Sequence, residues 1–486
     1  MPISKPVTDA RRRRAGAAFR AGRWIALAAL LPALILLGCG PRTEPGTSTA
    51  AAPTGGTATP RPTAAATRLV IVSPHNEFIR QEFERGFQRW YAERRGGAPA
   101  VEFEWQDRGG TYQMVEAIAG AYQALDDKDD GMGVDLVWGG GIEAMEQLKA
   151  AGATTAAALP QPVLDSLPAE IAGVRLYDPD GHWYGAVLSS FGIIYNKEVL
   201  RTLGVAAPAT WSDLSNPALF GHIVLADPSK SGSARVAFEV ILQKHGWAEG
   251  WALLMEIAGN TREFTDSASN VPSEVAQGSA AAGMSIDFYA FSQIESTGAE
   301  MLGYVSPVNA TALTPDPICM LRGGPNPAAA EAFMEFVLTK PGQSLWLLKP
   351  GAPGGPAEHG LWRMPILPAA YEHPADQRLI DFNPYASETT FNLDMDLSTR
   401  RSPLLGPLFM AAFLRNSELL RQAWRKVMTL PADAPLRRQF NAVPFSEEEA
   451  LDLARRYQAS PREASQLEID WQRRFRARYE QVLNAE

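Results

Sequence analysis

The chain has 486 residues, 46% of them apolar and 20% charged, which is typical of a globular protein with room for two or three domains. Its formal net charge is −9, and its N-terminal segment is basic, so the remainder is more acidic still. Such an acidic surface argues against nucleic acid or anionic lipid as a binding partner.

The first 38 residues combine a basic region with an apolar one. Four consecutive arginines, Arg11–Arg14, precede the apolar stretch Trp24–Gly38, which is too short for a comfortable membrane span. The segment Leu36–Cys39, Leu-Leu-Gly-Cys, resembles the lipobox of bacterial lipoproteins. This resemblance implies a signal peptide over residues 1–38, cleavage before Cys39, and a lipid on the Cys39 sulfur that anchors the protein to a membrane. The alternative is a buried helix in which the cysteine is incidental.

The next segment, 39–67, is rich in Thr, Ala, Pro and Gly and has almost no large apolar side chain. It cannot bury enough surface to offset its ordering entropy, so we expect a disordered tether behind the lipidated cysteine. Cys319 is the other cysteine of the chain and would have no disulfide partner. Its apolar neighbours predict a buried, unreactive thiol.

A first set of α/β elements begins at residue 68. Leu69–Val72 is a short apolar run typical of a buried parallel strand, and apolar residues at helical spacing come after it. The same order of strand, loop and helix returns twice, with strands expected at 101–105 and 134–138. Three such units in succession predict a doubly wound α/β sheet.

A second set has strands expected at 192–195, 222–226 and 283–288, and helices expected at 233–244 and 271–277. Two α/β sheets in one chain predict two lobes with a cleft between them.

We therefore divide the folded part into three. The first lobe comprises 68–188 and is completed by about 305–380, the second lobe comprises 189–304, and a helical extension occupies 381–486.

Two capping-box patterns mark helix starts in this extension, Ser446 with Glu449 and Ser460 with Glu463. The second opens a helix with an apolar stripe, which we expect to pack on the rest of the body.

The sharpest local signal is the segment 226–234, Ala-Asp-Pro-Ser-Lys-Ser-Gly-Ser-Ala, between an expected strand and an expected helix. Free N–H groups and the positive dipole end at a helix start bind anions. Gly232 lets a ligand approach the backbone, while Ser231 and Ser233 add hydroxyl donors. The alternative is simple N-capping by one serine. The segment lacks the glycine spacing and the Gly-Lys-Ser/Thr ending of an NTPase phosphate loop, which argues against nucleotide hydrolysis.

Polar and small residues also follow the carboxyl ends of the expected strands, where ligands bind in open α/β sheets. Each could instead be a turn residue; Asp287 could meet a ligand amine or anchor a loop, and Tyr289 could bind an anion or simply pack. The predicted ligand-binding residues are His75, Asn76, Gly110, Thr111, Gly140, Ser190, Ser231, Gly232, Ser233, Asp287 and Tyr289.

Nothing in the sequence predicts a catalytic, metal or cofactor site. The six histidines are scattered without a His-Glu-x-x-His pattern, and no Gly-x-Ser-x-Gly motif occurs. Asp126–Gly131 is similar to the start of a calcium loop, but the third position is Lys128 and the twelfth is Val137. We therefore expect no catalytic residues, no metal and no cofactor.

Three segments together resemble the substrate-binding proteins of ABC importers: Gly192–Lys197, Pro208–Leu214, and Phe220–Ile223 with the anion loop that follows. The similarity is to the extracellular solute-binding group that includes iron(III)-, thiamine- and phosphonate-type receptors. It covers residues 68–350, and the acidic, helical tail beyond 381 departs from it. It implies a type II periplasmic-binding fold.

In that fold the two lobes are joined by two crossover strands, here expected near 189–191 and 304–307. The ligand would be held by loops from both lobes, and closure of the lobes would present a surface to a membrane permease. We also expect a monomer.

The family's iron-binding members use adjacent tyrosines, but this sequence has Phe288 before Tyr289. A single phenol argues against ferric iron, whereas the serine-rich helix start favours a phosphonate or a phosphate ester. The leading hypothesis is a lipid-anchored receptor of an ABC importer at the extracytoplasmic face of the cell envelope. The alternatives are a ferric-iron receptor of the same family, a sensory ligand-binding module and an envelope hydrolase.

Overall fold

The computed structural model describes residues 67–94, 100–127, 130–386 and 391–486. Within these ranges, no helix combines the length and the apolar character that crossing a membrane requires. The predicted signal peptide, Cys39 and the tether up to residue 66 lie outside the described residues, so signal-peptide cleavage and lipidation stay predictions.

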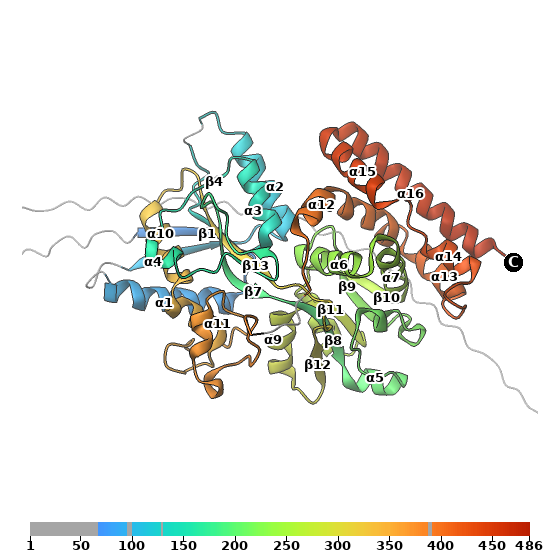
Figure 1. Cartoon of the computed structure of the whole chain (residues 1–486), viewed down its shortest axis with the longest axis horizontal. Helices are drawn as coiled ribbons and strands as arrows, with labels where there is room; N and C mark the ends of the chain where they lie inside the picture. The colour runs from blue at the N-terminus through green and yellow to red at the C-terminus, as the bar shows by residue number, and fades with distance from the viewer. Residues whose placement is uncertain (1–66, 95–99, 128–129, 387–390) are drawn as a thin grey trace, which may run out of the picture. The chain divides into compact units, whose positions relative to one another are not determined.

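The first sheet has the strand order β2-β1-β3-β13-β4, and β7 pairs with the first part of β13. Figure 1 labels β1, β4, β7 and β13 of this sheet. β1 runs parallel to β2 and β3, while β13 is antiparallel to β3. Its strands are β1 (Thr67–Val72), β2 (Val101–Gln106), β3 (Leu136–Trp138), β4 (Thr154–Thr155), β7 (Tyr184–Ser189) and β13 (Thr314–Leu321).

Helices cover both faces of this sheet because successive side chains of a strand point to opposite sides. In β1, Leu69 and Ile71 belong to the apolar cluster of α1 and α10, whereas Val70 and Val72 belong to the cluster of α2 and α3. The helices are α1 (Glu77–Arg94), α2 (Thr111–Gln123), α3 (Gly141–Ala150), α10 (Pro327–Leu338) and α11 (Lys340–Leu347). Smaller elements are α4 (Gln161–Leu164), β5 (Glu170–Ile171) and β6 (Val174–Arg175).

The second sheet has the strand order β10-β9-β11-β8-β12, in which β9, β10 and β11 are parallel and β8 and β12 join in antiparallel fashion. Its strands are β8 (Phe191–Asn196), β9 (Ile223–Ala226), β10 (Thr261–Thr265), β11 (Ala282–Ile286) and β12 (Leu302–Val305). Its helices are α5 (Lys197–Leu203), α6 (Gly232–His245), α7 (Trp247–Asn260), α8 (Asn270–Ala276) and α9 (Asp287–Thr297).

The chain passes from the first sheet to the second at Ser190, between β7 and β8, and returns between β12 and β13. After α11 it crosses a third time. Leu393 packs in the apolar cluster of α2 and α3, and Leu404 packs in the cluster of α6 and α7. We call the first sheet with its helices the first half of the body, and the second sheet with its helices the second half. The segment from Leu393 into α12 therefore contacts both halves.

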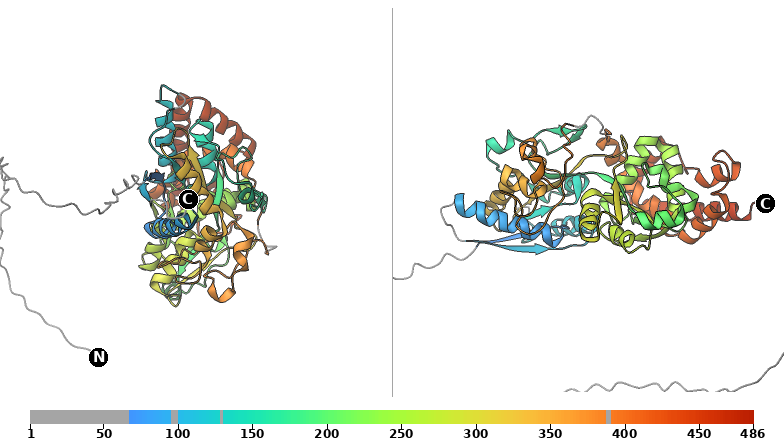
Figure 2. Two further views of the ribbon diagram at one scale, coloured as in Figure 1. Left: turned by 90° about the vertical axis from the view of Figure 1, so that its left-hand side faces the viewer. Right: turned by 90° about the horizontal axis from the view of Figure 1, so that it is seen from below.

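The C-terminal extension is helical, as predicted, and packs on the helices of the second sheet. Figure 2 shows its red helices beside the green α6 and α7 and away from the blue α1. Its elements are α12 (Met395–Phe409), a π-helical turn (Met410–Leu414), α13 (Ser417–Val427), α14 (Pro435–Asn441), α15 (Glu447–Ala459) and α16 (Pro461–Asn484).

α7 and α13 approach each other so closely at one point that a glycine is required there. A Cβ on Gly259 of α7 would lie 2.4 Å from the Trp424 ring of α13. The Trp424 indole N–H donates to Asn260 Oδ1 at 2.6 Å, so the buried indole is also satisfied.

One predicted capping box is complete and the other is half formed. The Ser446 N–H donates to Glu449 Oε2 at 2.7 Å, and the Glu449 N–H donates to Ser446 Oγ at 3.2 Å. Ser460 also accepts from the Glu463 N–H, at 3.3 Å, but the Glu463 carboxylate pairs with Arg456 instead of returning to the cap. A nearby cation therefore competes successfully for that carboxylate.

The predicted strand 283–288 is shorter than expected, because β11 ends at Ile286 and Asp287 begins α9. An acidic residue in the first turn stabilises a helix through the macrodipole, so Asp287 favours a helix start at this point. Cys319 is buried in β13, as predicted, and burial raises the pKa of its thiol to about 12.

Candidate functional site

A cavity of about 410 Å³ lies between the helices and loops of the two sheets. Eight of the predicted ligand-binding residues line it: His75, Gly110, Thr111, Gly140, Ser231, Gly232, Ser233 and Tyr289. They come from both sheets, at the carboxyl ends of β1, β3, β9 and β11 and after β2. These eight residues, which were predicted because they follow strand ends, therefore lie around one cavity.

Three predicted residues lie outside the lining. Asn76 is exposed and its Oδ1 accepts a hydrogen bond from the Ile79 N–H at 3.1 Å, so it caps the start of α1. Ser190 and Asp287 instead bond to each other. Asp287 Oδ2 accepts from the Ser190 N–H at 2.7 Å and from its hydroxyl at 3.1 Å. Asp287 thus anchors the first crossover between the sheets, which is one of its two expected roles.

A largely buried ion-pair cluster of His75, Asp316 and Arg363 lines the cavity. His75 Nε2 lies 2.9 Å from Asp316 Oδ2, and Arg363 Nη1 donates to the same oxygen at 2.9 Å. Burial would raise the pKa of Asp316, but the Arg363 guanidinium and the His75 hydrogen bond outweigh burial and hold that pKa well below its ordinary value. Burial lowers the pKa of His75. The cluster therefore contains a carboxylate, a guanidinium and a neutral imidazole near pH 7.

This cluster also fixes the loops around it. Arg363 Nη2 donates to Ser189 Oγ at 2.7 Å, at the end of β7. Asp316 Oδ1 accepts from the Gly140 N–H at 2.9 Å, at the start of α3. Gly140 has a φ of +105°, a conformation that a residue with a Cβ rarely adopts. Its backbone donor is already used, so the role of Gly140 is to shape the wall.

The start of α6 forms another part of the wall. The Ala234 N–H donates to Ser231 Oγ at 3.3 Å, so Ser231 is the N-cap of α6. This is the capping role that the sequence analysis gave as the alternative to anion binding. Its hydroxyl also lies 3.1 Å from Ser233 Oγ. Both serines line the cavity, so capping and contact with a ligand are compatible.

The starts of α2 and α6 meet across the cleft. A Cβ on Gly232 would lie 3.3 Å from Thr111 Oγ1, and a Cβ on Gly110 would lie 2.9 Å from the Lys230 carbonyl oxygen. The absence of side chains at these two glycines lets the helix ends approach. Two positive dipole ends therefore converge on the same cavity.

Tyr289 also lines the cavity, from the first turn of α9, and its ring lies 4.2 Å from that of Phe288. Burial raises the pKa of Tyr289 to about 12, so its phenol is neutral near pH 7 and can donate a hydrogen bond. Within the described part of the chain, no group of three or more His, Cys, Asp and Glu side chains is placed to hold a metal ion.

Residues 134–359 match the family of bacterial extracellular solute-binding proteins. This segment is an extracellular solute-binding domain. The domain match ends before α12 begins, so the extension lies beyond it.

Solved structures confirm the predicted type II periplasmic-binding fold. The periplasmic binding protein AfuA of Actinobacillus pleuropneumoniae, with exogenous fructose-6-phosphate bound, matches with a TM-score of 0.53 at 21% identity, over 65% of this chain and 92% of that one. The substrate binding protein of an ABC transporter from Agrobacterium tumefaciens matches with a TM-score of 0.51 at 17% identity, over 63% and 81%.

A curated relative is the phosphoglycerate transport regulatory protein PgtC of Salmonella typhimurium. It is 25% identical over 266 residues, which is 54% of this chain and 62% of the relative. The chain therefore aligns with less than two thirds of that relative's length.

The cavity also has lining residues that the sequence did not single out. Asp316 lies between two prolines at the start of an otherwise apolar strand, and this isolated charge is a usable signal. Arg363 lies in an irregular segment with no periodicity, so only the fold reveals it. The same is true of the lining residues from the extension, which are Leu393, Met395, Ser398, Thr399, Ser402 and Leu405.

Proposed function

We propose that the chain is the receptor of an ABC importer, which binds a small anionic ligand of the phosphate-ester or phosphonate class and delivers it to a membrane permease. It performs no catalysis and acts as a monomer, held at the extracytoplasmic face by a lipid on Cys39. The observation that carries this proposal is the convergence of two helix starts, α2 and α6, on one cavity between two sheets.

The charges in the cavity wall are compatible with an anion because most of its carboxylates are already paired. Asp316 pairs with Arg363, Glu143 with Arg235, Glu239 with Arg401 and Asp266 with Lys230. Paired carboxylates repel an incoming anion less than free ones would, and the helix dipoles are left to attract it.

The names of two similar proteins support the same ligand class. One is a phosphoglycerate transport regulatory protein, and the other is a periplasmic binding protein with fructose-6-phosphate bound. Both names specify a small organic phosphate.

Calorimetry on the purified full chain tests the proposal, with inorganic phosphate, 3-phosphoglycerate, fructose 6-phosphate and ferric citrate as probes. We expect binding of at least one organic phosphate. Ser231→Asp keeps an N-cap but places a negative charge at the start of α6, where the anion is proposed to bind. It should therefore weaken that binding at least about tenfold, or about 1.4 kcal/mol. Ser460→Asp makes the same change at the cap of α16, away from the cavity, and should leave binding unchanged.

Binding of ferric citrate but of no phosphate would contradict the ligand assignment. Equal affinity of the wild type and Ser231→Asp for a phosphate would contradict the placement of the anion at α6.

A sensory module is the second candidate, because the relative's name describes a transport regulatory protein. The two functions differ in what a deletion does. Loss of a transport receptor abolishes uptake of the labelled ligand even when the permease is expressed from a constitutive promoter, whereas loss of a sensor leaves that uptake intact.

A further inference from the structure

The extension supplies one wall of the cavity, along α12. Met395, Ser398, Thr399, Ser402 and Leu405 line the cavity from this helix, and Leu393 precedes them. Thr399 is exposed although it lines the cavity, so its side chain can reach a bound molecule. The wall therefore offers hydroxyl groups and apolar surface, with no charge of its own among these residues.

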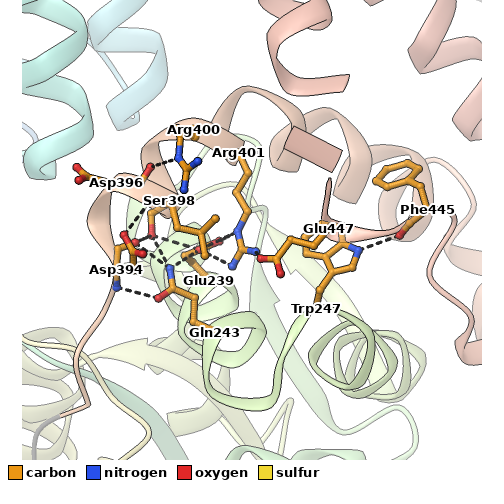
Figure 3. A network of polar contacts seen from close by, with 11 residues as sticks. Glu239, Gln243, Trp247, Asp394, Asp396, Ser398, Arg400, Arg401, Phe445 and Glu447 are labelled. Atoms are coloured by element: carbon orange, nitrogen blue, oxygen red, sulfur yellow. Dashed lines mark hydrogen bonds and ion pairs between the residues drawn. The ribbon is translucent and has the colours of Figure 1, made fainter. Parts of the chain in front are cut away.

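This wall is fixed to the second half of the body by a buried ion pair. Arg401 donates from Nη2 to Glu239 Oε1 at 2.7 Å and from Nε to the same carboxylate at 2.9 Å (Figure 3). Both side chains are almost fully buried. Ser398 donates to Glu239 Oε1 at 3.2 Å, and the Gln243 amide donates to Ser398 Oγ at 3.0 Å. α12 is therefore bonded to α6 along two of its turns.

The same helix is also attached to the first half. The Ser402 hydroxyl donates to Glu143 of α3, and Arg235 Nη1 of α6 donates to Ser402 Oγ at 3.3 Å. The Arg235 guanidinium lies 3.8 Å from the centre of the Tyr112 ring, and the Tyr112 hydroxyl donates to Glu143 Oε2 at 3.0 Å. Ser402 thus lies where α2, α3, α6 and α12 meet.

We propose that α12 is a third wall of the ligand site, in addition to the two lobes, and that Thr399 limits the size of the organic part of the ligand. This inference rests on the proposed function. A cavity of about 410 Å³ is far larger than an inorganic phosphate ion, so an anion at the start of α6 leaves space beside α12. The class that fits both features is an organic phosphate whose carbon chain or hydroxyl groups contact α12.

The test is calorimetry on three full-length proteins: the wild type, Thr399→Trp and Arg400→Trp. Arg400 is the next residue along α12, is exposed and lies outside the cavity lining, so it is a matched control. The probes are inorganic phosphate, 3-phosphoglycerate and fructose 6-phosphate. We expect Thr399→Trp to lose at least tenfold in affinity for the organic phosphate that the wild type binds, and Arg400→Trp to stay within twofold. Any affinity for inorganic phosphate should be unchanged in both.

The possible outcomes distinguish a failure of the proposal about α12 from a failure of the proposed function. If the wild type binds an organic phosphate and Thr399→Trp binds it equally well, the wall is wrong and the function stands. If Arg400→Trp loses as much as Thr399→Trp, the loss is not local and the wall is also wrong. A wild type that binds none of the probes contradicts the function and the wall with it. Should Thr399→Trp not fold, Thr399→Leu replaces it, with a smaller loss expected in the same direction.

Discussion

Asp287 illustrates how one buried carboxylate can connect two elements. It accepts hydrogen bonds from the N–H and the hydroxyl of Ser190, at the first crossover, and from the Phe288 N–H at 2.7 Å. These bonds favour the charged form, yet burial outweighs them and raises the pKa of Asp287 to about 6. A group with a raised carboxyl pKa holds its proton more tightly in the folded than in the unfolded state.

Stability should therefore fall as the pH rises from about 4 to about 6, because the folded state gives up this proton at a higher pH than the unfolded state does. Asp287→Asn carries no charge and should lack this decline. The free energy of unfolding of the wild type relative to the variant is expected to fall by about 2 kcal/mol over that range. Urea unfolding of both proteins measures it, with the exposed Asp381→Asn as control. A difference independent of pH would show that Asp287 does not titrate in this window.

At the scale of elements, α12 and α6 are joined by a buried ion pair whose net contribution is not obvious from its geometry. Arg401 and Glu239 lie in the interior, where desolvation opposes their attraction. Arg401 also donates to Glu447 at 2.6 Å, at the start of α15. One guanidinium thus connects three helices, as Figure 3 shows. Removing it would leave the Glu239 carboxylate buried with no cation.

Arg401→Met should lower the free energy of unfolding by about 3–5 kcal/mol, the usual cost of breaking a buried pair. Adding Glu239→Gln removes the orphaned charge and should recover part of this loss. Arg476→Met breaks an exposed pair with Glu480 and should cost less than about 1 kcal/mol. Denaturant unfolding of the four proteins gives these values. A loss at Arg401 as small as that at Arg476 would mean that solvent reaches the pair.

At the scale of the whole molecule, the extension completes the core of the second half. Leu404, Leu408, Phe409 and Phe413 share an apolar cluster with Phe238 and Trp251. The Trp251 and Phe409 rings stack with centroids 5.8 Å apart. These side chains face α6 and α7, whose apolar surface would otherwise meet water.

A chain that stops after Ile380 should therefore aggregate when expressed alone, because it exposes the faces of α6 and α7 that the extension buries. Co-expression of residues 391–486 as a separate polypeptide should restore a soluble complex, since the contacts are side-chain packing and hydrogen bonds. Size-exclusion chromatography checks both results. A soluble, cooperatively unfolding truncated chain would show that the solute-binding domain is stable without α12–α16.

Elements with a local cause could be predicted from the amino-acid sequence. The apolar run of β1, the complete capping box at Ser446 and the loop before α6 all depend on neighbours within a few residues. The α/β class could also be predicted. Because ligands bind at the carboxyl ends of strands in such folds, so could eight of the residues that line the cavity. The pairing of Arg363 with Asp316 could not be predicted in this way, nor could the positions of Thr399 and Ser402 at the cavity. Contacts between residues so far apart in the chain depend on how the elements pack, and no local periodicity or propensity encodes them.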